Sequence, residues 1–142
     1  MSAAHAQTGK RRRGRVVLVV DDDVDCREMI RDALVEAGHV VLEAGDGAEA
    51  LRLLLADDQP EPMLIVLDLW LPIMSGAELL RVLKGYHRLS RIPVILTSAG
   101  PGYGAEEGVQ AGWLPKPFDV ERLLALVNER CAAKEPSVAS GE

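Results

Sequence analysis

The stretch Leu64-Ile65-Val66-Leu67-Asp68-Leu69-Trp70-Leu71-Pro72 decides the fold. Its four consecutive apolar residues, 64–67, are typical of a strand that is buried on both faces of a parallel sheet. The strand ends on the carboxylate of Asp68, and Pro72 then takes the chain out of regular structure. Open α/β sheets place their functional crevices at the carboxyl ends of the strands, so Asp68 is the first candidate site residue.

Strands followed by helices recur along the chain. Short apolar runs mark four further strands, and apolar residues at helical spacing mark the helices between them. The further strands are predicted at residues 16–20, 40–42, 92–97 and 113–114. Because crossovers between parallel strands are right-handed, this order predicts an α/β fold. It is a doubly wound five-stranded parallel sheet with helices on both faces.

Capping residues mark several helix boundaries. Asp46 with Glu49, and Ser75 with Glu78, have the spacing of capping boxes at helix starts. Gly38 stands where the helix after the first strand is expected to end. These signals place the first three helices between the predicted strands, as a doubly wound sheet requires.

Length and composition indicate one domain in a reducing compartment. The chain has 142 residues, of which 48% are hydrophobic, and this suffices for one core. We expect no signal peptide, and no apolar run approaches the ~20 residues that span a bilayer. Cys26 and Cys131 lack the spacing of metal ligands, and we expect thiols in preference to a disulfide. We therefore predict a cytoplasmic protein with no membrane partner.

Charge is distributed unevenly along the chain. The net charge is −6, yet all 22 acidic residues follow residue 15. The basic residues before that point are Lys10, Arg11, Arg12, Arg13 and Arg15. An acidic body argues against nucleic acid as the main partner, because binding to phosphates requires Lys and Arg. We predict a disordered basic tail at 1–14, with a binding role as the alternative, and a flexible tail at 135–142.

Polar residues stand at the carboxyl ends of the predicted strands. They are Asp21, Asp22, Asp23, Asp68, Thr97, Ser98 and Lys116. In a parallel sheet these ends meet at one edge, so we expect the side chains to come together. Clustered carboxylates repel one another unless a cation joins them, and oxygen ligands with room for water suit Mg²⁺.

Carboxylates, Mg²⁺, a hydroxyl and a lysine describe a site that handles one phosphoryl group. Asp68 stands alone on its strand and is the natural nucleophile. A simpler interpretation is that Asp21, Asp22 and Asp23 only cap the first helix and Asp68 only caps a turn. Caps explain one or two of these residues. They do not explain a set that spans the ends of several strands, so we favour the phosphoryl site.

Four ordered motifs carry a resemblance to a known family. They are Val19-Val20-Asp21-Asp22-Asp23, Leu67-Asp68-Leu69-Trp70-Leu71-Pro72-Ile73-Met74-Ser75-Gly76, Pro93-Val94-Ile95-Leu96-Thr97-Ser98-Ala99 and Lys116-Pro117-Phe118. Together they resemble the receiver domain of two-component response regulators, of the chemotaxis-regulator-like, stand-alone kind, over residues 15–134. The resemblance implies a flavodoxin-like sheet with strand order 2-1-3-4-5. It also implies that Asp68 is the phosphoacceptor for a histidine kinase's phosphohistidine.

The resemblance assigns a metal site to the acidic residues. It implies that Asp22, Asp68 and the backbone carbonyl of Trp70 bind Mg²⁺, and that Asp21 acts through a water molecule. Asp23 resembles a frequent third acidic residue of the motif, which need not touch the metal.

The resemblance also assigns residues to the phosphoryl group and the switch. Ser98, followed by the small residue Ala99, would move to hydrogen-bond the phosphoryl group, and Lys116 would pair with it. Lys116 and Pro117 would be joined by a cis peptide bond. Trp113 occupies the position of the aromatic switch residue, and its alternative role is that of a core aromatic.

The chain departs from the family in two places. The distance from Ser98 to Lys116 is several residues shorter than usual, and glycines at 100, 102, 104 and 108 each disfavour a helix by about 1 kcal/mol. We therefore predict a shortened or irregular fourth helix. Trp70 is bulky for its position beside Asp68, and our hypothesis is that it alters water access and phosphate lifetime.

These features predict a phosphorylation-controlled binding module and not a turnover enzyme. Its partners would be a sensor histidine kinase or phosphotransfer protein and a downstream protein target, and it would be a monomer or weak dimer. One alternative is an unswitched receiver-like scaffold that binds a protein constitutively through its altered fourth-helix region. Another is a small aspartyl-phosphate phosphatase, but that class needs a general-acid Asp where this chain has Trp70.

Overall fold

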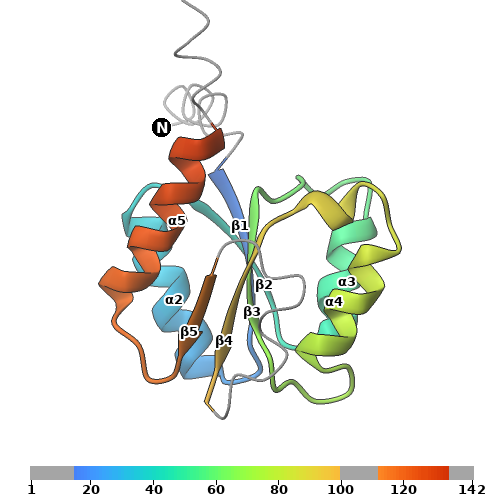
Figure 1. Cartoon of the computed structure of the whole chain (residues 1–142), viewed down its shortest axis with the longest axis horizontal. Coiled ribbons are helices and arrows are strands. Elements are labelled where there is room, and N and C mark those ends of the chain that lie inside the picture. The colour runs from blue at the N-terminus through green and yellow to red at the C-terminus, as the bar shows by residue number, and fades with distance from the viewer. Residues whose placement is uncertain (1–14, 100–111, 135–142) are drawn as a thin grey trace, which may run out of the picture.

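A sheet of five parallel strands forms the centre of the computed structural model, which describes residues 15–99 and 112–134 (Figure 1). The strands are β1 (Val16–Val20), β2 (Val40–Ala44), β3 (Leu64–Asp68), β4 (Val94–Ser98) and β5 (Gly112–Pro115). Their order in the sheet is β2-β1-β3-β4-β5, with every neighbouring pair parallel. The predicted flavodoxin-like order is thus confirmed.

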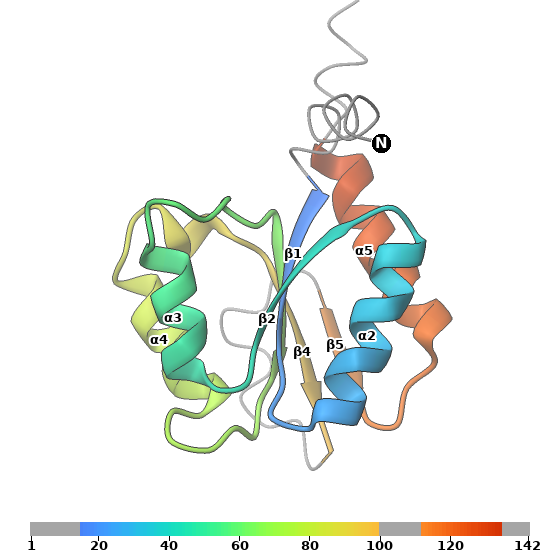
Figure 2. The ribbon, with the colours of Figure 1, turned by 180° about the vertical axis from the view of Figure 1, so that it is seen from behind.

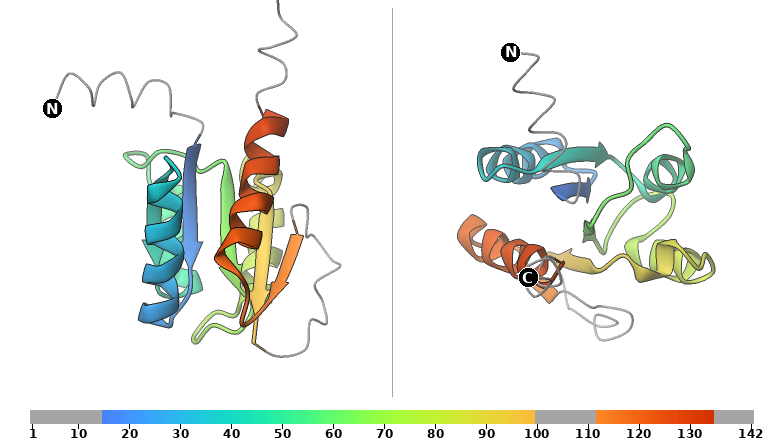
Figure 3. Two further views of the ribbon diagram at one scale, coloured as in Figure 1. Left: turned by 90° about the vertical axis from the view of Figure 1, so that its left-hand side faces the viewer. Right: turned by 90° about the horizontal axis from the view of Figure 1, so that it is seen from above.

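Helices cover both faces of the sheet. The described helices are α2 (Val24–Glu36), α3 (Gly47–Leu55), α4 (Gly76–Lys84) and α5 (Val120–Lys134), with a short 3₁₀ helix, η2 (Leu89–Arg91). The helices α2 and α5 lie on one face, and α3 and α4 lie on the other (Figure 2). Viewed from above, the sheet runs between these two helix pairs (Figure 3). No helix in the described ranges is long and apolar enough to cross a membrane.

Alternation along the strands explains why their sequences are continuously apolar. In β1, Leu18 and Val20 join the core beneath α3 and α4, whereas Val17 and Val19 join the core beneath α2 and α5. Successive side chains of a strand point to opposite faces, and both faces are covered here, so every position is buried. The same holds throughout β3, which carries Asp68 at its last position.

Two predicted helix boundaries are confirmed and one is partly wrong. Gly38 follows the C-cap of α2 with φ of 100°, a conformation that glycine adopts readily. Ser75 and Glu78 form the complete reciprocal box at the start of α4. At α3, Asp46 accepts from the Glu49 backbone as predicted. The Glu49 carboxylate, however, accepts from the backbone N–H of Gly45, one residue upstream of the N-cap.

Some strand limits also differ from the prediction. β2 continues to Ala44 because its pairing with β1 extends to the Ala44 backbone, where Asp21 N–H donates to the Ala44 carbonyl at 3.1 Å. β4 begins at Val94, and β5 includes Gly112 and Pro115. The predicted tails and the shortened fourth helix fall on residues 1–14, 135–142 and 100–111, which lie outside the described residues.

Candidate functional site

Three predicted carboxylates come together at the carboxyl ends of the strands. Asp21 and Asp22 follow β1, and Asp68 is the last residue of β3. One carboxylate oxygen from each of these residues lies within 4.8 Å of the other two. Asp21 and Asp68 are buried, with 1% and 5% of their surfaces exposed, whereas Asp22 is exposed. The three residues therefore form a cluster that opens to solvent on the Asp22 side.

Lys116 reaches this cluster from the end of β5. Its Nζ lies 2.9 Å from Asp21 Oδ2 and 3.3 Å from Asp68 Oδ2, so one ammonium bridges the two buried carboxylates. The backbone N–H of Lys116 donates to the Ser98 carbonyl at 2.7 Å, which ties β5 to the end of β4. The peptide bond between Lys116 and Pro117 is cis.

Burial and charge act in opposite directions on this pair. Burial raises the pKa of Asp68, although the backbone N–H of Trp70 and the charge of Lys116 act to lower it. Burial acts to lower the pKa of Lys116, but the hydrogen bond and charge of Asp21, followed by the charge of Asp68, raise it above its ordinary value. Lys116 is therefore cationic at neutral pH.

The donor set fits Mg²⁺. One ammonium faces three carboxylates, so ionisation of all three leaves a negative excess that a divalent cation would neutralise. All three groups offer the hard oxygen ligands that Mg²⁺ prefers, and the exposed Asp22 leaves room for water. The nearby thiol of Cys26 has its pKa raised to about 11 by burial and by the charge of Asp21. It stays protonated and does not offer a soft ligand.

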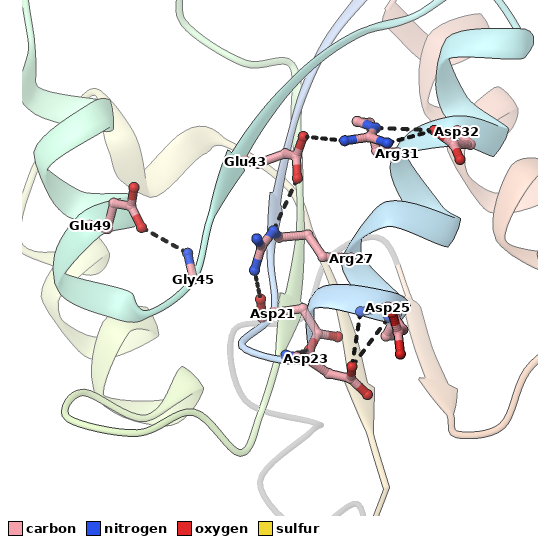
Figure 4. Close-up of polar contacts among 10 residues, drawn as sticks. Asp21, Asp23, Asp25, Arg27, Arg31, Asp32, Glu43, Gly45 and Glu49 are labelled. Atoms are coloured by element: carbon pink, nitrogen blue, oxygen red, sulfur yellow. Dashed lines mark hydrogen bonds and ion pairs between the residues drawn. The ribbon is translucent and has the colours of Figure 1, made fainter.

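Asp23 has a separate structural role. Its Oδ1 accepts from the backbone N–H groups of Asp25 and Cys26 and thereby caps α2 (Figure 4). Its own backbone N–H donates to Asp21 Oδ1 at 2.9 Å. The capping interpretation therefore applies to Asp23, which lies outside the cluster formed by Asp21, Asp22 and Asp68.

Sequence reasoning missed a charged brace beside the acidic loop. Arg27 donates from Nη1 to the Asp21 carbonyl at 2.8 Å and from Nε to Glu43 Oε1 at 3.0 Å (Figure 4). Arg31 holds the other oxygen of the same carboxylate, from Nη1 to Glu43 Oε2 at 3.2 Å. This brace, Arg27 with Glu43 and Arg31, links α2 to β2 and fixes the backbone that carries Asp21.

Trp70 connects Asp68 with Ser98. Its backbone N–H donates to Asp68 Oδ1 at 3.1 Å, and its indole Nε1 donates to Ser98 Oγ at 3.1 Å. Ser98 is fully buried at the end of β4, whereas Trp70 is 44% exposed. The structure thus places Ser98 beside the residue that also holds the Asp68 carboxylate.

The remaining predicted residues are Ala99 and Trp113. Ala99 is exposed and lines a cleft with Lys116, Pro117, Phe118 and the start of α2. Trp113 is half-buried in β5 and packs against the core beneath α3 and α4. Its indole Nε1 is buried and has no hydrogen-bond partner in the described part of the chain.

The loop between β3 and α4 lies close against β3, the strand that carries Asp68. A Cβ at Gly76 would lie 2.5 Å from the Asp68 carbonyl oxygen and 2.8 Å from Leu69 Cα, so only glycine fits without a backbone shift. Ile73 in this loop has φ of 67°, a left-handed conformation that is strained for a β-branched residue. The sequence motif contained Gly76, but the close approach becomes visible only in three dimensions.

The fold and the acidic cluster define a doubly wound α/β domain with a candidate cation site at its sheet edge. The model of the response regulator receiver domain family matches residues 17–128. This chain therefore belongs to the response regulator receiver domain family, a family of signalling domains.

Similar proteins support this assignment. Response regulator MprA of Mycobacterium tuberculosis is 36% identical over 128 residues, which are 87% of this chain and 54% of MprA. The chain thus spans about half the length of that relative. The receiver domain of NtrX from Brucella abortus has a TM-score of 0.70 and 30% identity, covering 80% of this chain and 96% of that domain.

A second similar structure contains magnesium. The receiver domain of sensor histidine kinase PA1611 from Pseudomonas aeruginosa PAO1 has a TM-score of 0.70 and 26% identity, covering 82% of this chain and 96% of that domain. That structure has a magnesium ion coordinated in its active site cleft.

Proposed function

We propose that this chain accepts a phosphoryl group on Asp68 from the phosphohistidine of a sensor histidine kinase or phosphotransfer protein. The modification would then switch its binding to a downstream protein in two-component signalling. The observation that carries the proposal is the position of Asp68, buried at the end of β3 beside two further carboxylates and the Lys116 ammonium.

The proposed step forms a bond between an Asp68 carboxylate oxygen and phosphorus and breaks the phosphorus–nitrogen bond of phosphohistidine. The imidazole leaves with the electron pair and takes a proton from solvent. Asp22, Asp68 and the Trp70 carbonyl would hold Mg²⁺ directly, and Asp21 would act through water; the bound ion would supply positive charge for the phosphoryl oxygens. Lys116, which now contacts Asp68 Oδ2, would pair with a phosphoryl oxygen. The Ser98 hydroxyl would donate a hydrogen bond to another phosphoryl oxygen.

The same proposal includes a route for the donor and a switch. The cleft bordered by Ala99, Lys116 and Phe118 opens beside the ammonium and offers the donor imidazole an approach. Trp113 would act as the aromatic switch, because its buried indole N–H has no partner among the described residues, and such burial is costly. Movement toward solvent would satisfy that donor.

We also propose a cytoplasmic location, in line with two cysteines that form no disulfide.

Acetyl phosphate tests the proposal. With Mg²⁺ present, we expect the wild-type chain to gain the mass of one phosphoryl group, and the Asp68→Asn variant to gain none. Asp32→Asn is the matched control, because Asp32 is an exposed α2 carboxylate that pairs with Arg31. An equal gain in Asp68→Asn would contradict the assignment of the phosphoacceptor. No gain in the wild type would favour the unswitched scaffold.

Turnover of a simple phosphate ester separates the receiver from the phosphatase alternative. We expect none, because the position two residues after Asp68 is occupied by Trp70, which cannot act as a general acid. Sustained, Asp68-dependent release of phosphate from such an ester would contradict this.

A further inference from the structure

Trp70 makes contact with two partners of different kinds at the site. Through its backbone N–H it holds Asp68 Oδ1, and through its indole N–H it holds Ser98 Oγ, each at 3.1 Å. The second contact joins residues 28 positions apart, so it links the loop after β3 to the end of β4. One residue therefore fixes the carboxylate and the hydroxyl relative to each other.

The backbone that leads into Trp70 is held by two hydrogen bonds. The preceding residue, Leu69, donates its N–H to the Thr97 carbonyl at 2.8 Å and accepts at its own carbonyl from Gly76 N–H at 2.9 Å. These backbone bonds tie the loop to β4 on one side and to the start of α4 on the other. The indole therefore reaches Ser98 from a fixed position even though Trp70 is 44% exposed.

The direction of the hydrogen bond determines where the Ser98 proton can go. An indole N–H can only donate, a phosphoryl oxygen can only accept, and a hydroxyl can do both. When Trp70 donates to Ser98 Oγ, the Ser98 proton cannot point at the indole. It must point toward an acceptor elsewhere. The resulting order, from indole N–H to hydroxyl to phosphoryl oxygen, satisfies each group, and bonds in such a chain strengthen one another.

We propose that Trp70 is a positioning residue that orients the Ser98 hydroxyl to donate to a phosphoryl group on Asp68. The inference rests on the proposed function, since it concerns the phosphorylated form of the same site. It differs from an effect of side-chain bulk on water access, because it depends on a single N–H group and on the Ser98 oxygen.

A double-mutant cycle tests the proposal with beryllofluoride, a phosphoryl mimic, in the presence of Mg²⁺. Trp70→Phe keeps an aromatic ring but removes the N–H, and we expect it to weaken beryllofluoride binding about fivefold, the size expected for one hydrogen bond. In a Ser98→Ala background the same substitution should change the affinity no further. In a Ser98→Thr background, which keeps the hydroxyl, the weakening should return.

Two outcomes of the cycle overturn the proposal. If Trp70→Phe weakened binding equally in the wild-type and Ser98→Ala backgrounds, the ring would act by bulk alone. Tighter binding by Trp70→Phe would show that the indole holds the hydroxyl away from the phosphoryl group. If wild type neither binds beryllofluoride nor accepts phosphate, the proposed function fails first, and the two failures are thereby distinguished.

A second measurement needs no metal. The indole N–H groups of Trp70 and Trp113 give two nitrogen-correlated NMR signals, which Trp113→Phe would assign. We expect Ser98→Ala to shift the Trp70 signal and to speed its exchange with solvent, while the Trp113 signal changes little. An unchanged Trp70 signal would show that the bond to Ser98 is absent in solution and would overturn the proposal.

Discussion

The two flanks of the acidic cluster are stabilised in different ways. On the β1 and β2 flank, the Asp21 backbone is held by Arg27, which Glu43 and Arg31 support in turn, so the brace consists of charged groups with overlapping contacts. On the β3 and β4 flank, the Trp70 indole holds the Ser98 hydroxyl, and the backbone at Gly76 packs closely against Asp68. The first flank therefore depends on several charged contacts, whereas the second depends on one neutral hydrogen bond and on backbone packing.

The packing on the β3 flank is the most sensitive point. Gly76→Ala places a Cβ against the Asp68 carbonyl and Leu69 Cα, and because both contacts are backbone we expect a loss of about 3 kcal/mol in the free energy of unfolding. Urea denaturation measures this loss. Gly85→Ala is the control, since its Cβ would meet only the Val82 carbonyl at 3.3 Å and its φ is −79°. A similar loss in both variants would show that the contact at Asp68 is not special.

Mg²⁺ should stabilise the protein through the acidic cluster. At a concentration of 100 times its Kd, a ligand bound only by the folded state adds about 2.7 kcal/mol to the free energy of unfolding. We expect thermal unfolding to show this gain in the wild type and to show little in Asp22→Asn. That variant should fold normally because Asp22 is exposed. If Asp22→Asn kept the full Mg²⁺ effect, the metal would bind elsewhere.

The charged brace on the β1 flank gives a smaller effect. Arg27→Ala removes the bond to the Asp21 carbonyl and the partly buried pair with Glu43, and we expect it to lower the free energy of unfolding by about 1.5 kcal/mol. Arg31→Ala, which leaves the Asp21 contact intact, should change stability much less, since the Arg31 side chain is more exposed than that of Arg27 and exposed ion pairs contribute little. Equal losses in the two variants would show that the Arg27 contact with the Asp21 carbonyl adds no stability of its own.

The ionisation of Asp68 should produce the smallest effect. Burial raises its pKa, so the folded state binds this proton more tightly than the unfolded chain does. The contribution of Asp68 to stability therefore falls as pH rises from the pKa of Asp68 in the unfolded chain through its higher pKa in the folded state. It is least favourable at neutral pH. With EDTA present, we expect Asp68→Asn to raise the Tm by a few degrees at neutral pH and by less under acidic conditions. A gain that did not depend on pH would contradict the role of ionisation.

The fold and the acidic residues could be predicted because they leave local signals. Continuous apolar runs at 16–20 and 64–67 identified strands buried on both faces, and the carboxylates at their ends followed directly. The brace could not be predicted in the same way. It depends on the register that pairs Val19 with Glu43, and no local pattern shows which α2 residue will face that strand.

Side-chain direction set a second limit on prediction. The sequence showed Trp70 to be bulky beside Asp68, but the contact of its N–H with Ser98 depends on the side-chain rotamer and on the loop path. The shifted capping box at α3 has the same cause. The spacing of Asp46 and Glu49 was recognisable, whereas the choice of the Gly45 N–H as donor depends on local backbone geometry.

The left-handed backbone of Ile73 has a consequence for engineering. A β-branched residue with φ of 67° and 84% exposure carries a conformational cost of about 1–2 kcal/mol with few contacts to offset it. Ile73→Gly would remove this conformational cost and raise thermal stability. Glycine at this position would also make the loop more flexible, and the position lies only three residues after Trp70. A variant selected for heat tolerance at this position would therefore place Trp70 less precisely beside Asp68 and Ser98.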